Sequence, residues 1–144
     1  MYYMATTIRK NVFETNSSSS HSLVIGFENN ISGDIEILNG TLNVSDLENF
    51  IIKGGYYDNY EFILCDTKNK KLALTFAIIL NRLDDDKWNN NTYYHDLFEN
   101  LKNQYDIIEV IGEYYHAWDE DGQLQQLIDV IDTNIVVQSK YENN

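Results

Sequence analysis

Proline is absent from this sequence, cysteine occurs once, and basic residues are scarce. Without proline, the chain must make its turns with Gly, Asn and Asp. The single cysteine, Cys65, cannot form a disulfide within the chain, so a reducing compartment is expected. The 10 Lys and Arg residues face 23 Asp and Glu, giving a net charge of −13. A nucleic-acid-binding protein is therefore not expected, because such proteins present a basic face to the phosphates.

Long hydrophobic runs are also missing. The longest, near Leu72 to Leu80, is interrupted by Thr75 and is far shorter than the roughly 20 apolar residues of a membrane helix. The first seven residues lack the charged-then-apolar layout of a signal peptide. These features predict a cytoplasmic protein without membrane contact.

The composition is nevertheless that of a folded protein. Hydrophobic residues make up 43% of the 144 residues and aromatic residues 13%, which is enough for a real core. We expect a single domain over residues 1–144, frayed at 1–5 and 140–144. The acidic charge suits either an encounter with a basic protein surface or solubility alone.

Turn chemistry gives the clearest local pattern. Asn39-Gly40 supplies the positive φ angles of a type I′ turn and therefore predicts a β-hairpin. Hydrophobic residues alternate with polar ones on both sides of it: Ile35 and Ile37 before the turn, Leu42 and Val44 after it. In this hairpin, Ile37 faces Leu42 and Ile35 faces Val44. Directly afterwards, Ser45-Asp46-Leu47-Glu48 resembles a capping box, so a short helix is expected that ends at Gly54-Gly55.

The remaining elements follow from hydrophobic periodicity. Strands are predicted at Thr6–Phe13, Ser22–Phe27, Tyr60–Asp66 and Ile135–Val137, and helices at Asn69–Leu83, Tyr93–Tyr105 and Leu124–Ile131. Ile107–Trp118 suits either type, and its β-branched and aromatic content favours a strand. The order of elements lacks βαβ alternation. It predicts an α+β fold, in which about four helices pack on a small mixed or antiparallel sheet with an N-terminal hairpin.

A dense polar segment between the first two predicted strands is the main candidate site. Its candidate ligand-binding residues are Arg9, Glu14, Thr15, Asn16, Ser17, Ser18, Ser19, Ser20 and His21. Hydroxyls, small-residue N–H groups and one Arg can form an anion cradle, with His21 as a general acid or base beside a serine nucleophile. Two simpler alternatives are a flexible Ser-rich turn and a loop whose side chains brace the two strands.

The run Arg-Lys-Asn-Val-Phe-Glu-Thr-Asn-Ser-Ser-Ser-Ser-His-Ser, residues 9 to 22, resembles an N-terminal signature of small uncharacterised proteins encoded by bacteriophages and prophages. The resemblance covers this segment alone. It implies a phage or prophage setting, and it implies that Arg9, Glu14, Asn16, the serines and His21 act together. It implies no particular activity.

Other candidates are weaker. His116, Asp119 and Asp121 could suggest a metal site, but a carboxylate-rich loop with one His is more often a solvated turn, so no metal is predicted. Cys65 is expected in the core. The pairs Tyr56-Tyr57, Tyr93-Tyr94 and Tyr114-Tyr115 are expected to place one ring inside and one outside. No P-loop, Rossmann or zinc-type pattern is present, and no cofactor is predicted.

Two functions therefore stand as hypotheses. The first is a phage accessory binding protein that captures or inhibits a host component, either a defence protein or a small signalling ligand, through the Arg9–Ser22 segment and an acidic, Tyr-rich surface. Its partner is a host protein or a small anionic ligand. The alternative is an enzyme acting on a phosphate- or nucleotide-like substrate, in which Arg9 holds the anion, Ser17–Ser20 bind or attack, and His21 moves a proton.

Overall fold

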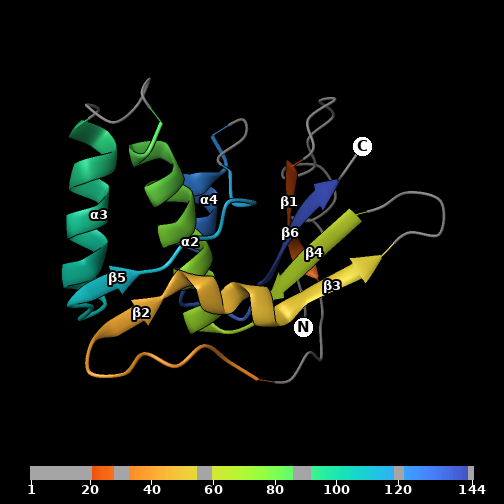
Figure 1. Ribbon diagram of the computed structural model, residues 1–144, viewed down its shortest axis with the longest axis horizontal. Helices are drawn as coiled ribbons and strands as arrows, with labels where there is room; N and C mark the ends of the chain where they lie inside the picture. The colour runs from red at the N-terminus through yellow and green to blue at the C-terminus, as the bar shows by residue number, and fades with distance from the viewer. Residues whose placement is uncertain (1–20, 28–32, 55–59, 86–91, 119–121, 143–144) are drawn as a thin grey trace.

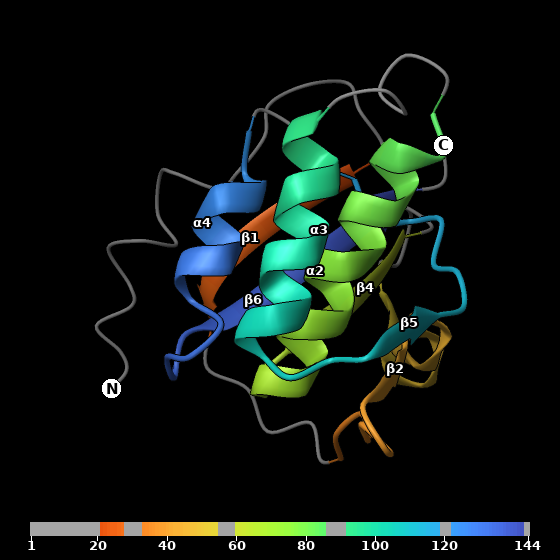
Figure 2. The same cartoon turned by 90° about the vertical axis from the view of Figure 1, so that its left-hand side faces the viewer.

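The computed structural model describes residues 21–27, 33–54, 60–85, 92–118 and 122–142. Over these residues the predicted α+β fold is confirmed, with a helical layer packed on one face of an antiparallel sheet (Figures 1 and 2). The sheet has the order β1 (His21–Phe27), β6 (Val136–Glu142), β4 (Tyr60–Cys65), β3 (Ile51–Gly54). Each neighbouring pair of strands in it is antiparallel.

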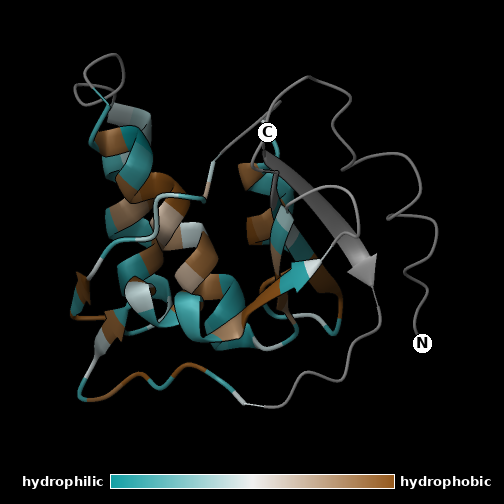
Figure 3. Cartoon of the chain, turned by 45° about the vertical axis from the view of Figure 1, so that its right-hand side comes forward, coloured by the Kyte–Doolittle hydropathy of each residue, from teal (hydrophilic) through white to brown (hydrophobic). Residues whose placement is uncertain are grey.

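Helix α2 (Lys68–Leu83) lies at the centre of the helical layer. Its N-cap is Thr67, whose hydroxyl accepts a hydrogen bond from the Lys70 N–H at 3.1 Å. Residues 70–79 of this helix are all buried, because the sheet and the other helices surround it. Those helices are α3 (Thr92–Gln104), α4 (Leu124–Asp129) and the 3₁₀ helix η2 (Val44–Phe50). Figure 3 shows hydrophobic residues recurring along the helices. No helix in the described part of the chain is long and apolar enough to span a membrane.

The predicted turn at Asn39-Gly40 is confirmed, but the predicted hairpin is wrong. Both residues have positive φ, 52° and 79°, as a type I′ turn requires. The antiparallel pairing stops at a single bridge between Leu38 and Thr41. Strand β2 (Thr41–Asn43) instead pairs in parallel with β5 (Glu109–Ile111), far along the chain. The hydrophobic alternation after the turn therefore serves burial of Leu42 and Val44, and not a hairpin face.

The predicted capping box is also wrong. The N-cap of η2 is Asn43, whose side chain accepts from the Ser45 N–H at 3.0 Å. The Ser45 hydroxyl is used elsewhere, on the backbone of Glu113. The helix ends at Phe50, and the chain continues directly into β3, where Gly54 is the last strand residue and not a helix stop. Pairing of β3 with β4 outweighs the local helical pattern at Ile51.

Of the other predicted elements, the strands at Ser22–Phe27, Tyr60–Asp66 and Ile135–Val137 and the three helices are confirmed with shifted bounds. Of Ile107–Trp118, the preferred strand is limited to β5, and the rest of that segment within the described chain is loop. β6 is longer than predicted and extends to Glu142, into the tail expected to fray. His21 is the first residue of β1 and not the end of a loop. The predicted strand Thr6–Phe13 lies outside the described residues, and the N-terminal hairpin of the predicted fold, at Asn39-Gly40, does not form.

Two lysines in the first turn of α2 are fully buried, although a helix N-terminus disfavours cations. The Lys71 ammonium donates to the carbonyls of Val130, Thr133 and Ile135 at 3.0, 2.8 and 2.8 Å. Burial lowers the pKa of Lys71. The Lys70 ammonium lies 2.8 Å from Asp66 Oδ1. These lysines therefore connect α2 to the loop after α4 and to the end of β4.

Candidate functional site

Most of the predicted site cannot be placed. Arg9, Glu14, Thr15, Asn16, Ser17, Ser18, Ser19 and Ser20 lie outside the described residues. His21 is placed by its backbone alone, in the edge strand β1 opposite Tyr141, and Ser22 lies opposite Lys140. The convergence of Arg9, the serines and His21 therefore stays a prediction.

The weaker candidates are resolved in part. Cys65 is fully buried, and burial raises the pKa of its thiol to about 12, so it is a core residue as predicted and is unsuited to nucleophilic attack. His116 packs edge-to-face on Tyr114 with ring centroids 5.8 Å apart. Asp119 and Asp121 lie outside the described residues. Among the residues that are described, no group of three or more His, Cys, Asp or Glu is arranged to hold a metal ion.

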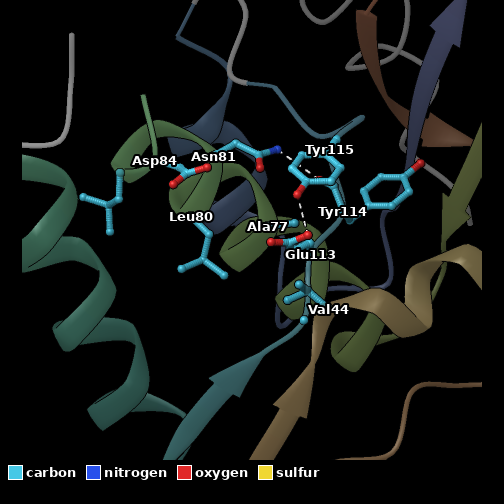
Figure 4. A pocket seen from close by; sticks show the side chains of 10 residues that line it. Val44, Ala77, Leu80, Asn81, Asp84, Glu113, Tyr114 and Tyr115 are labelled. Atoms are coloured by element: carbon cyan, nitrogen blue, oxygen red, sulfur yellow. Dashed lines mark hydrogen bonds between the residues drawn. The ribbon is translucent and has the colours of Figure 1, made fainter. Parts of the chain in front are cut away.

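A cleft with a volume of about 260 Å³ lies at the C-terminal end of α2. Asp84 and Leu80 lie on one side of it, and Glu113 and Tyr115, from the loop after β5, lie on the other (Figure 4). Its lining is Val44, Ala77, Leu80, Asn81, Leu83, Asp84, Gly112, Glu113, Tyr114 and Tyr115. The volume is below the roughly 300–1,000 Å³ of small-molecule sites, so the cleft suits one long side chain better than a whole ligand.

The loop that forms one wall of the cleft is held by backbone and side-chain bonds to η2. The Ser45 hydroxyl accepts from the Glu113 N–H at 2.9 Å and donates to the Glu113 carbonyl at 3.2 Å. Gly112 before it has φ +85°, and a Cβ there would lie 2.2 Å from Asn43 Oδ1 and 2.4 Å from Ser45 Oγ. Only glycine fits this close approach, so Gly112 sets the direction of the wall.

Asn81 connects the helix to the far end of the same loop. Its side-chain amide donates to the carbonyls of Tyr114 and Ala117 at 3.0 and 2.6 Å. An amide nitrogen has two protons, and both are used here. The polar atom that Asn81 still offers to the cleft is its carbonyl oxygen, which can only accept hydrogen bonds.

The Tyr114-Tyr115 pair divides as predicted, and so does Tyr93-Tyr94. Tyr114 is 5% exposed and packs in the core, whereas Tyr115 is 59% exposed at the mouth of the cleft; the corresponding values for Tyr94 and Tyr93 are 7% and 51%. The Tyr115 hydroxyl donates to Glu113 Oε2, and this bond raises the pKa of Tyr115. Burial raises the pKa of Tyr114. The carboxylate and the exposed ring are therefore held side by side. Tyr56-Tyr57 lies outside the described residues.

The polar side chains of the cleft all offer acceptors, apart from the two tyrosine hydroxyls. Asp84 and Glu113 contribute carboxylates, and no Lys or Arg is among the described residues that line the wall. A second hollow of about 500 Å³ shares Gly112, Glu113 and Tyr115 with the cleft and adds Ser45 and Glu48. A surface of this kind attracts cationic groups and disfavours anions.

This site was not predicted from the sequence, because its walls come from three segments far apart in the chain: α2, η2 and the loop after β5. The one pattern pointing to it was the Tyr114-Tyr115 pair, which predicted an exposed ring suited to an interface. Glu113 directly precedes this pair, but nothing in the sequence sets it apart from the other acidic residues. Compared with known proteins, the chain matches no family model, no curated protein and no solved structure.

Proposed function

We propose that this protein is an acidic phage accessory factor that captures or inhibits a host protein in the host cytoplasm by binding a basic part of its surface. The observation that carries the proposal is the cleft at the end of α2, where Asp84 and Glu113 stand beside an exposed Tyr115 and the lining residues that the structure describes include no basic side chain. Acidic patches with exposed aromatic side chains are typical of surfaces that bind basic protein segments.

The rest of the described loop supports a protein partner. Three exposed large side chains fall within eight residues of the chain: Ile111 is 41% exposed, Tyr115 59% and Trp118 37%. Aromatic residues supply much of the binding energy at protein interfaces because they bury large area at low entropic cost. The net charge of −13 adds long-range attraction to a basic partner. The resemblance of residues 9–22 to phage and prophage proteins supports the host setting.

An enzyme acting on a phosphate-bearing substrate has less support. Carboxylates at Asp84 and Glu113 repel an anionic substrate from the cleft. The same repulsion favours a host protein over a small anionic ligand as the partner at this cleft.

A salt-dependent capture experiment tests the proposed function. The tagged full-length protein is incubated with bacterial lysate at 50 mM and 500 mM salt, and retained proteins are identified by mass spectrometry. We expect a basic host protein that is retained at low salt and is largely lost at high salt, because the Debye length falls from about 14 Å to about 4 Å. Glu113→Gln should weaken its retention, whereas Glu99→Gln on the exposed face of α3 should not. Retention that ignores salt and Glu113 contradicts the proposal.

A further inference from the structure

We infer that the cleft at the end of α2 receives an arginine side chain of the partner, with the flanking residues of that partner lying over the adjoining Ser45–Glu48 hollow. The inference rests on the proposed function and specifies the chemistry of its partner. It depends on three features of the cleft, namely an aliphatic floor, acceptors at the rim and an aromatic ring beside a carboxylate.

The floor of the cleft fits the stem of a long basic side chain. Val44 and Ala77 are fully buried below it, and Leu80 and Leu83 are half-buried at its side. Long basic side chains lay their methylene groups along apolar surface and keep the charged head at a polar edge. A cleft of about 260 Å³ has room for such a stem.

The polar rim of the cleft fits the charged end of a long basic side chain. Asp84 and Glu113 face each other across the cleft (Figure 4). Asn81 contributes its amide oxygen, because both protons of its amide nitrogen are already donated to backbone carbonyls. The cleft also opens at the C-terminal end of the 16-residue helix α2, where the helix dipole favours a positive charge. Arg82 lies in that last turn but is not part of the lining. Since the described lining has no positive group of its own, the rim favours a cation supplied by the partner.

Tyr115 favours arginine over lysine. Its ring is 59% exposed and is held next to Glu113 by the hydroxyl–carboxylate bond. A guanidinium is planar, so it can stack on an aromatic face while it donates two parallel hydrogen bonds to a carboxylate. A lysine ammonium, which is compact and strongly hydrated, cannot satisfy both at once.

The adjoining hollow extends the site along the partner chain. It shares Glu113 and Tyr115 with the cleft and adds the exposed carboxylate of Glu48. An extended segment with one arginine in the cleft would place a following residue near Glu48. Charge complementarity thus favours a segment with two basic residues close together.

Peptide titrations test the inference directly. The full-length protein, labelled with ¹⁵N, is titrated with Ac-Gly-Arg-Gly-Arg-Gly-NH₂ and with its lysine counterpart, and amide chemical shifts are followed. We expect shifts at Gly112, Glu113 and Tyr115, and a Kd about 3-fold or more lower for the arginine peptide. Glu113→Gln, which keeps an acceptor for the Tyr115 hydroxyl, should raise the Kd about 5-fold through loss of the charge. Tyr115→Ala should abolish the preference for arginine, whereas Tyr115→Phe should retain it.

The controls separate this inference from the proposed function. Glu99→Gln removes one exposed charge on α3 and should leave the Kd unchanged. Equal binding of both peptides, equal weakening by Glu99→Gln and Glu113→Gln, or shifts confined to other residues would each overturn the arginine site, and so would an absence of binding. The outcome of the lysate experiment is independent of these results. Salt-sensitive capture of a basic protein would still support the proposed function.

Discussion

The two ends of α2 use their hydrogen-bond acceptors in opposite ways. At the N-terminal end, the acceptors of the loop after α4 surround the ammonium of Lys71, and Asp66 pairs with Lys70. At the C-terminal end, Asp84 and Glu113 line a cleft whose described lining includes no Lys or Arg. Both ends gather acceptors from segments far apart in the chain, but within the described residues the acceptors of the first end surround a lysine, whereas those of the cleft open to solvent.

This difference separates structural from functional polarity. A buried cation that meets three carbonyls links two elements and contributes to stability, because each partner would cost free energy if left alone. Carboxylates at an open cleft stay hydrated, so they add little to the free energy of folding in either direction. Polar groups of the second kind are the ones expected to meet a partner. Substitutions at the two ends should therefore have opposite effects on stability and on binding.

The largest effect is expected at Lys71. Lys71→Met keeps the side-chain length but removes the donor from the carbonyls of Thr133 and Ile135, whereas the Val130 carbonyl keeps the Thr133 hydroxyl and N–H as donors. At roughly 1–3 kcal/mol for each unsatisfied acceptor, the free energy of unfolding should fall by about 3 kcal/mol or more in urea denaturation. Lys68→Met, at an exposed position of the same helical turn, is the matched control and should change it by less than about 0.5 kcal/mol. Similar values for both variants would refute the structural role of Lys71.

Gly112 should give the next largest effect, since it places the wall of the cleft. Gly112→Ala combines a positive φ with a clash against Asn43 and Ser45, and we expect a loss of about 2–3 kcal/mol in thermal or urea unfolding. Gly122→Ala has a comparable φ of +71° but no atom within 4 Å of the new Cβ, so it should cost only about 1 kcal/mol. Only Gly112→Ala should also weaken binding of the arginine peptide. Equal losses of stability in Gly112→Ala and Gly122→Ala would contradict the prediction, because they would mean that the loop at Gly112 moves to accommodate a Cβ.

Alkaline pH should also lower the free energy of unfolding, through the buried thiol of Cys65 near the N-terminal end of α2. The pKa of Cys65 is raised from 9.0 to about 12 by burial, so between these values the unfolded chain loses a proton that the folded protein keeps. The folded protein is therefore destabilised as pH rises above 9, by about 1.4 kcal/mol for each pH unit from this thiol. Urea denaturation of the wild type and Cys65→Ala at pH 8, 9, 10 and 11 isolates the thiol, because the other groups titrate in both proteins. A constant difference between them above pH 9 would contradict the burial of Cys65.

The smallest effect on stability is expected at the cleft. Glu113→Gln should change the free energy of unfolding by less than about 0.5 kcal/mol, because the carboxylate is exposed and glutamine still accepts from the Tyr115 hydroxyl. The same variant should show the largest loss of peptide binding. A strong loss of stability in Glu113→Gln would place this carboxylate with the structural acceptors and would remove the contrast between the two ends.

Much of the fold was predictable from local patterns. The hydrophobic spacing of Asn69–Leu83 predicts α2 to within one residue at its start, and Asn39-Gly40 predicts its turn. The hairpin expected around that turn does not form, because β2 finds a parallel partner in β5, some 70 residues away. Local alternation cannot specify which strand a segment will pair with. The helix expected up to Gly54 is shortened for the same reason, since β4 recruits Ile51–Gly54 as a strand.

The candidate site was harder to predict than the fold. The division of Tyr114 and Tyr115 between core and surface was expected from the sequence and is confirmed. The position of Glu113 beside Tyr115, opposite Asp84, depends on the Ser45 and Asn81 bonds that fix the loop to η2 and α2. Ser45 was assigned to a helix cap, and its contact with Glu113 spans 68 residues. The buried state of Lys70 and Lys71 was likewise not predicted, because lysines in a helix are normally exposed.

The sequence by itself determined the acidic charge, the α+β class, the positions of the main helices and the division of a tyrosine pair between core and surface. These properties follow from composition and from periodicities within about twenty residues, which act before distant segments meet. Only the tertiary structure decided which strands pair, which lysines are enclosed and which carboxylates share a cleft. Most of those outcomes depend on contacts between distant residues, from 12 positions apart for Ile51 and Ile63 to 120 for His21 and Tyr141. Burial and hydrogen bonding of one segment by another outweigh local preference there.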